Sequence, residues 1–219
     1  NIVFDIDLEG LSSVIIHQKS QVRFFFAAAD SQGIIAGFRQ NSQTGQLGFE
    51  FGQLLGLEAT CADSGYIGQN EFVIHGDSTG KVHRQEQGNS FNNVDIFSLY
   101  QTPFLHMQDP EQRKIFYNVA TYLRSEGDNE LTMSVLYDYE DFNTLGPTNF
   151  TLTTENAAAY YNEALYNSTA VFDGNPAPVK RTNVSGSGKS VAFKYVTNDT
   201  NASHSIQGLV ITFGVGDRL

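Results

Sequence analysis

The chain is poor in cysteine, tryptophan and positive charge. It has one cysteine, no tryptophan, and 13 Lys and Arg against 24 Asp and Glu. Cys61 cannot form an internal disulfide, and a single cysteine excludes the paired spacings of zinc ribbons and thioredoxin-like sites, so we expect it to be a small buried hydrophobe. A formal net charge of -11 argues against a surface that grips duplex DNA, because counterion release requires cations.

Long apolar runs are missing as well. The longest, around Val22 to Ala29, is far shorter than the roughly 20 residues that cross a bilayer, so no membrane span is expected. The opening NIVFDIDLEG alternates apolar and acidic residues and has no basic region followed by an apolar one. It predicts a strand over 1–8, in a chain that is processed or truncated before Asn1.

What is present favours β-structure. The chain has 219 residues, 40% of them hydrophobic, which is enough for one large or two small domains with a core. Helical periodicity is nearly absent, whereas short runs rich in Val, Ile, Phe and Tyr recur between clusters of Gly, Asn, Asp and Ser. The predicted class is all-β, with strands over 1–8, 13–17, 21–28, 33–39, 47–54, 59–62, 71–75, 81–86, 96–101, 115–125, 131–139, 150–154, 191–197 and 206–213.

The strand spacing divides the chain near Val94. In the first part it is typical of sandwiches, barrels and propellers. From residue 95 the strands are longer and richer in tyrosine, which fits a separate antiparallel β-sandwich over 95–219. Residues 155–167 are predicted to form a helix or an irregular crossover, and residues 173–178 a loop.

Asn183 to Ser190, NVSGSGKS, ends like a phosphate-binding loop. Asn183 stands where the first glycine is required, and the following VAFKYVT alternates like a strand, so no helix N-terminus would face a phosphate. A glycine-rich β-turn is the preferred interpretation.

Asp63-Ser64-Gly65 matches the core triplet of aspartic proteases, whose chemistry needs two facing carboxylates. One copy occurs, so a protease would have to be a homodimer. The residue before the acid is Ala62 in the sequence CADSGYIG, and a turn between two strands is the preferred interpretation.

The histidines His75 and His83 bracket the predicted hairpin over 76–80. With a two-residue loop, His83 pairs with Ile74 and His75 with Val82, which places the imidazoles on opposite faces and excludes a shared metal ion. A loop one residue longer would bring them to one face.

The acids Asp138, Glu140 and Asp141 resemble a site for a hard cation at first glance, but a solvated strand edge is the preferred interpretation. The acids at the start of the chain begin like a calcium loop, yet Ile16 occupies the position of its closing glutamate. Sequons for N-glycosylation occur at Asn149, Asn167, Asn183, Asn198 and Asn201 and are interpreted as chance matches.

Several phrases, taken in order, resemble the C-terminal half of the tail hub or nozzle proteins of short-tailed bacteriophages. They are QVRFFF with GIIAGF, EFVIHGDSTGKVHRQEQGNSF, TPFLHMQDPEQRKIFYNVATYLRSEG, LYDYED, and NVSGSGKSVAFKY with SIQGLVITFGVGDRL. The resemblance implies an incomplete, propeller-like β-domain of about two blades over 1–94, followed by the sandwich. It also implies that Gly76, Gly80 and Gly88 serve turns and that Lys114 begins a strand.

The function implied is that of a structural protein of the virion: part of a ring, expected to be hexameric, through which genomic DNA passes during ejection. The resemblance implies adaptor and fibre or spike proteins as partners, and no catalytic, cofactor-binding or metal-binding residues. The alternative is a β-sandwich at the tail tip that binds a glycan or a receptor, with Tyr100, Tyr160 and Tyr161 as candidate aromatic contacts.

Overall fold

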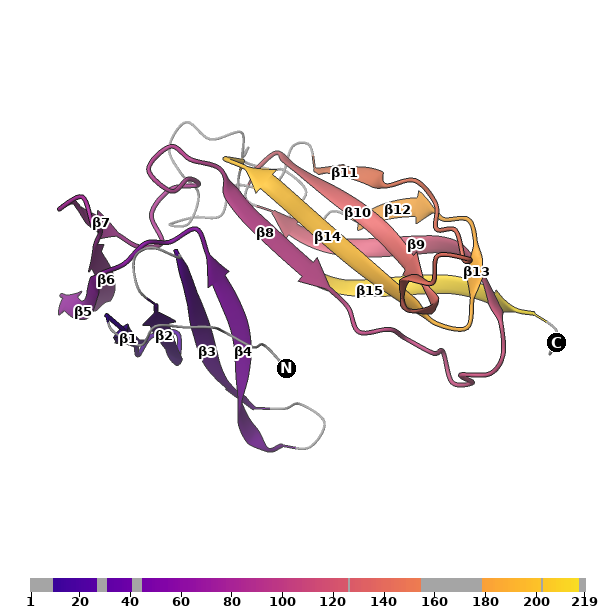
Figure 1. The fold of residues 1–219 in the computed structure, drawn as a ribbon, viewed down its shortest axis with the longest axis horizontal. Helices are drawn as coiled ribbons and strands as arrows, with labels where there is room; N and C mark the ends of the chain where they lie inside the picture. The colour runs from indigo at the N-terminus through magenta and orange to yellow at the C-terminus, as the bar shows by residue number, and fades with distance from the viewer. Residues whose placement is uncertain are drawn as a thin grey trace. The chain divides into compact units, whose positions relative to one another are not determined.

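The computed structural model describes residues 10–26, 31–40, 45–125, 127–154, 179–201 and 203–216. Within these ranges the regular structure consists of strands and one 3₁₀ turn, and every strand pair is antiparallel (Figure 1). The prediction of an all-β protein is therefore confirmed. The strand predicted over 1–8, the helix or crossover over 155–167 and the loop over 173–178 lie outside the described residues.

The chain forms two compact units, Asn1–Phe91 and Asn92–Leu219. This division falls close to the boundary predicted between residues 94 and 95. Each unit has its own apolar core.

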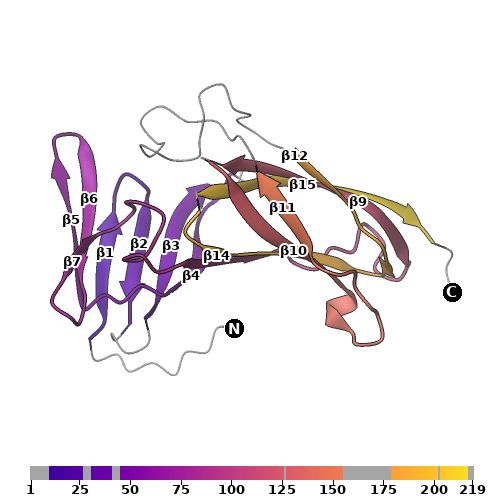
Figure 2. The ribbon, with the colours of Figure 1, turned by 90° about the horizontal axis from the view of Figure 1, so that it is seen from above.

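Unit 1 contains two up-and-down sheets. The first has the order β1 (Ser12–Ile16), β2 (Gln21–Phe25), β3 (Gln32–Gln40), β4 (Leu47–Leu55). Figure 2 shows β1, β2 and β3 side by side in this order. The second has the order β5 (Cys61–Ile67), β6 (Asn70–Gly76), β7 (Val82–Arg84). The first strands of the two sheets are neighbours, and the Ser64 hydroxyl of β5 donates to the Ile15 carbonyl of β1 at 2.7 Å.

Alternation along these strands gives each sheet an inner and an outer face. The inner faces share a core of five buried residues, which are Val14, Ile16, Phe25, Ala59 and Val73. In each sheet, the residues that alternate along the strands with the inward-facing residues therefore lie on the outer face. Both outer faces point away from the shared core.

Unit 2 contains two sheets with a common core. One has the order β11 (Phe150–Thr154), β10 (Asn129–Tyr137), β14 (Val191–Asp199), β8 (Ile96–Gln101). The other has β12 (Val179–Asn183), β9 (Lys114–Ser125) and β13 (Ser187–Gly188), with β15 (His204–Val215) also paired to β9. The core takes buried residues from both sheets: Phe116, Val119, Leu123, Leu131, Met133, Val135, Tyr137, Leu152, Val184, Val191, Phe193 and Tyr195.

The pairing of β9 with β15 is irregular at two places, between Ile206 and Gly208 and between Thr212 and Phe213. At the second place, Thr212 pairs with Asn118 but Phe213 pairs with Phe116, so Tyr117 has no partner on β15. The extra residue changes the phase of β9, and Phe116 and Val119 both reach the core although their positions differ by three.

Lys114 begins β9, as the resemblance implies, and its side chain is buried. Its ammonium group donates to the main-chain carbonyls of Asp109 and Lys189, the latter at 3.2 Å. The start of β9 is thereby joined to the turn that precedes it and to the glycine-rich turn before β14.

Candidate functional site

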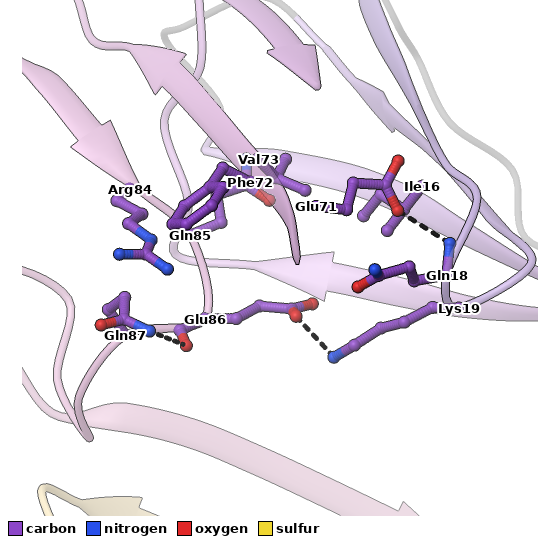
Figure 3. A pocket seen from close by; sticks show the side chains of 10 residues that line it. All are labelled: Ile16, Gln18, Lys19, Glu71, Phe72, Val73, Arg84, Gln85, Glu86 and Gln87. Carbon is purple, nitrogen blue, oxygen red and sulfur yellow. Dashed lines mark hydrogen bonds and ion pairs between the residues drawn. The ribbon is translucent and has the colours of Figure 1, made fainter. Parts of the chain in front are cut away.

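A pocket of about 320 Å³ lies in unit 1 between the β1–β2 turn, β6 and the segment that follows β7 (Figure 3). Charged and amide side chains dominate its lining, together with Phe72. The lining residues are Ile16, Gln18, Lys19, Glu71, Phe72, Val73, Arg84, Gln85, Glu86 and Gln87.

Glu86 is the centre of a charge network at one side of this pocket. Its carboxylate accepts from Lys19 at 2.5 Å and from the buried Arg23, and Arg23 also donates to Gln85 Oε1 at 2.7 Å. Burial opposes ionisation of Glu86, but Lys19 and Arg23 outweigh it and hold the pKa of this carboxyl below its usual value. Glu86 is thus ionised at neutral pH.

Glu71 has a comparable role at the other side of the pocket. Its two oxygens accept from the backbone amides of His17 at 3.0 Å and Gln18 at 2.7 Å. Desolvation raises the pKa of Glu71, but the amides of Gln18 and His17 together lower it by more, so the net shift of this pKa is downward. Both carboxylates are ionised and hydrogen-bonded, so neither supplies a proton. Their contacts join the β1–β2 hairpin to β6 and to the segment after β7.

The histidine pair differs from the prediction. His75 and His83 are directly opposite each other in the β6–β7 ladder, and their rings stack with centroids 5.1 Å apart. The prediction of opposite faces is wrong because Asp77 lies opposite Lys81 and the loop has three residues, 78–80, so the alternative of a loop one residue longer is confirmed. Both imidazoles lie on the inner face, where His75 is buried.

Asp77 explains the longer loop. Its carboxylate accepts from the Thr79 amide and hydroxyl, the Lys81 amide and His83 Nε2, all within 2.9 Å. These bonds, that of His83 first, lower the pKa of Asp77 well below its usual range. Burial, and then the neighbouring His83, lower the pKa of His75.

Asp63-Ser64-Gly65 lies inside β5, so the predicted turn at this triplet is wrong. Asp63 pairs with Ile74 on the exposed side of the sheet, and its Oδ1 accepts the amide of Ser64 at 2.8 Å. Cys61, expected to be buried, is exposed at the start of the same edge strand.

The glycine-rich segment forms the short strand β13 and then bends before β14. Asp138 has a role at this bend that the sequence does not predict. Strand β10 ends at Tyr137, and Asp138–Glu140 form the 3₁₀ turn η2, so the predicted strand edge at these acids is wrong. Asp138 Oδ1 accepts the amides of Lys189 at 2.6 Å and Ser190 at 2.9 Å. A carboxylate thus occupies the amides that a phosphate would need.

The residues of the glycan-binding alternative are only partly described. Tyr100 lies on β8, is 50% exposed and stacks on Tyr195 with ring centroids 6.4 Å apart. Tyr160 and Tyr161 lie outside the described residues. Among the sequons, Asn149 accepts a hydrogen bond from Ser134, Asn183 accepts one from Asn118, and Asn167 is outside the described residues.

No group of three or more His, Cys, Asp or Glu residues in the described ranges is placed to hold a metal ion. Among the same residues, no helix has the length and apolarity required to cross a membrane. No protein-family model matches the chain, and no curated protein matches its sequence.

Proposed function

We propose that the chain is a structural, non-catalytic component of a bacteriophage tail, one subunit of a ring-shaped hub or nozzle through which genomic DNA passes. The observation that carries the proposal is the order of its parts. Two antiparallel meanders come first, and a separate unit of two sheets around one core follows.

The meanders support a propeller-like interpretation of unit 1. Each starts with its own first strand, β1 or β5, and these two strands are neighbours. In a propeller blade the first strand is innermost and the later strands lie progressively further out, so the first strands of adjacent blades converge around the axis. Unit 1 supplies one four-stranded and one three-stranded meander of this kind.

The charge of the chain agrees with a conduit. A formal net charge of -11 would repel the phosphates of passing DNA, whereas a basic wall would hold them by counterion release. The carboxylates of the pocket and of the Asp138 turn are committed to hydrogen bonds within the chain, which is what a structural role requires.

The test is the copy number and symmetry of the chain in purified phage particles, by electron microscopy with an antibody against unit 2. We expect six copies in a ring at the tail, in contact with adaptor and fibre or spike proteins. Particles that lack the chain, or that carry it outside the tail, would contradict the proposal.

Ejection kinetics provide a second readout. Particles in which several exposed acids are replaced by lysine should release DNA more slowly at low salt and recover at high salt, because screening shortens to about 3 Å at 1 M. Equal rates at low salt would remove the conduit argument.

A further inference from the structure

The outer face of the first sheet of unit 1 is apolar and free of charge. It consists of Ser13, Ile15, Val22, Phe24, Gln32, Ile34, Ala36, Phe38, Gln40, Leu47, Phe49, Phe51, Gln53 and Leu55, as the strand register assigns them. None of these is Asp, Glu, Lys or Arg. Phe51 is 69% exposed, Leu47 63% and Phe49 54%, and Phe49 contacts both Phe38 and Phe51.

The outer face of the second sheet is also largely apolar, but its relief is different. It consists of Cys61, Asp63, Gly65, Ile67, Asn70, Phe72, Ile74, Gly76, Val82 and Arg84. Val82 is 73% exposed and Ile67 71%. Small residues, Gly65, Gly76 and Cys61, lie among the larger ones, and a side-chain atom added at Gly65 would meet nothing within 4 Å.

The two faces differ in the size of the side chains that they expose. The first presents a row of protruding phenylalanines, and the second has open space at Gly65, whereas at Gly76 the Cys61 Sγ lies 3.0 Å from where a Cβ would be. Large side chains opposite small ones are the arrangement that fills a sheet-on-sheet interface. The charges of the second face, Asp63 and Arg84, lie on its two edge strands with Ile74 between them, and the Arg84 guanidinium stacks on the Phe72 ring. At the rim of an interface both charges can keep their contact with water.

Within one chain these faces cannot cover each other, because both point away from the core that the two sheets share. A face of one copy can, however, cover the other face of the next copy. Such a head-to-tail contact leaves one face open at each end and continues until the ring closes.

We propose that the outer face of sheet β1–β4 binds the outer face of sheet β5–β7 in a second copy of this chain. The contact repeats between copies the sheet-on-sheet packing that exists inside unit 1, and it deepens the ring proposed above by naming its subunit interface.

The experiment uses the purified full chain and three lysine variants. Phe51→Lys blocks the first face, Ile74→Lys blocks the second, and Phe142→Lys is the matched control at a side chain of unit 2 that is 88% exposed. Light scattering and sedimentation measure the mass of each protein. Wild type and Phe142→Lys should associate, and each face variant alone should associate at least about thirtyfold more weakly, the loss expected for an interface hot spot.

The decisive sample is an equimolar mixture of Phe51→Lys and Ile74→Lys. The first retains an intact second face and the second an intact first face, so the mixture should form a one-to-one heterodimer and nothing larger. Circular dichroism checks folding, and Phe51→Gln with Ile74→Gln repeat the test with a residue type that the first face already carries.

Three results would overturn the interface. They are a wild-type chain that stays monomeric, an Ile74→Lys protein that assembles like wild type, and a ring that survives Phe51→Lys. The last would leave the tail-ring proposal standing with another contact surface. The absence of the chain from phage particles would remove the proposed function without affecting a measured heterodimer.

Discussion

The two units place their apolar side chains differently. Among the described residues, the core of unit 2 has twelve buried members between two sheets, whereas the core of unit 1 has five, and both units expose large apolar side chains. In unit 1, charged side chains also join the two sheets, through Arg23, Glu86 and Glu71. The difference indicates that burial in a shared core stabilises unit 2 to a greater extent than unit 1.

The largest expected effect is in the core of unit 2. Phe193 is fully buried, so Phe193→Ala should lower the free energy of unfolding of unit 2 by about 3–5 kcal/mol through lost transfer energy and a cavity. Phe142→Ala, at an exposed position, should change it by less than about 0.5 kcal/mol. Calorimetry of both variants measures the difference, and similar losses would show that unit 2 is not organised around this core.

The next effect is in the first sheet of unit 1. A Cβ added at Gly33 would lie 2.3 Å from the Phe24 carbonyl oxygen, so Gly33→Ala should cost about 1–3 kcal/mol through overpacking. Gly48→Ala in the same sheet would meet nothing within 4 Å and serves as the control. Denaturant unfolding that gives equal midpoints for the two variants would contradict the strand pairing of β2 with β3.

An effect of similar size is expected where Asp138 holds the glycine-rich turn. Asp138→Ala removes the acceptor for the amides of Lys189 and Ser190 and should destabilise unit 2 by about 1–3 kcal/mol. Glu140→Ala, in the same 3₁₀ turn, should be close to neutral. Amide hydrogen exchange at residues 189 and 190 should accelerate in the first variant alone, and unchanged protection there would show that the carboxylate does not cap the turn.

The smallest effects concern pH. The pKa of His75 in unit 1 and that of His204 in unit 2 are both lowered below the usual 6.5, in each case mainly by burial. Each histidine is therefore neutral in the folded state, and the stability of its unit is complete above about pH 6.5 and declines as the pH falls from there through the folded-state pKa. Hydrogen exchange between pH 5 and 8 should show the decline in both units.

Substitution separates the two contributions. His75→Gln should reduce the pH dependence of the stability of unit 1 alone, and His204→Gln that of unit 2 alone. A single substitution that reduces the pH dependence of both units would mean that the units do not unfold independently.

The sequence predicts the strands whose alternation is regular, and it fails where a distant partner decides. Asp63, Ser64 and Gly65 are turn-forming residues, yet pairing with β6 keeps them in a strand, because strand propensity is weak against tertiary context. The register of the hairpin with His75 differs from that of a two-residue loop because the bonds of the Asp77 carboxylate stabilise a loop that is one residue longer. Asp138 leaves the strand for a contact 51 residues away, which no local pattern reveals.

Some other features can be predicted from the sequence, and some cannot. The missing first glycine and the alternating residues after Ser190 correctly argued against a phosphate loop, and β14 occupies that position. The network of Lys19, Arg23 and Glu86 has no local signal, since Glu86 lies 63 residues from Arg23 and further from Lys19 along the chain. The strands β12 and β13 are short and polar, so they gave no hydrophobic signal.

The uncharged outer face of sheet β1–β4 has a colloidal consequence. Copies that each carry a formal charge of -11 repel one another over about 30 Å at 0.01 M salt, but over only about 8 Å at physiological ionic strength. The attraction between apolar faces acts at contact and persists at either salt concentration. Ionic strength therefore sets whether two copies approach closely enough for the face to act, so the chain is best kept dispersed in dilute buffer and brought together by salt.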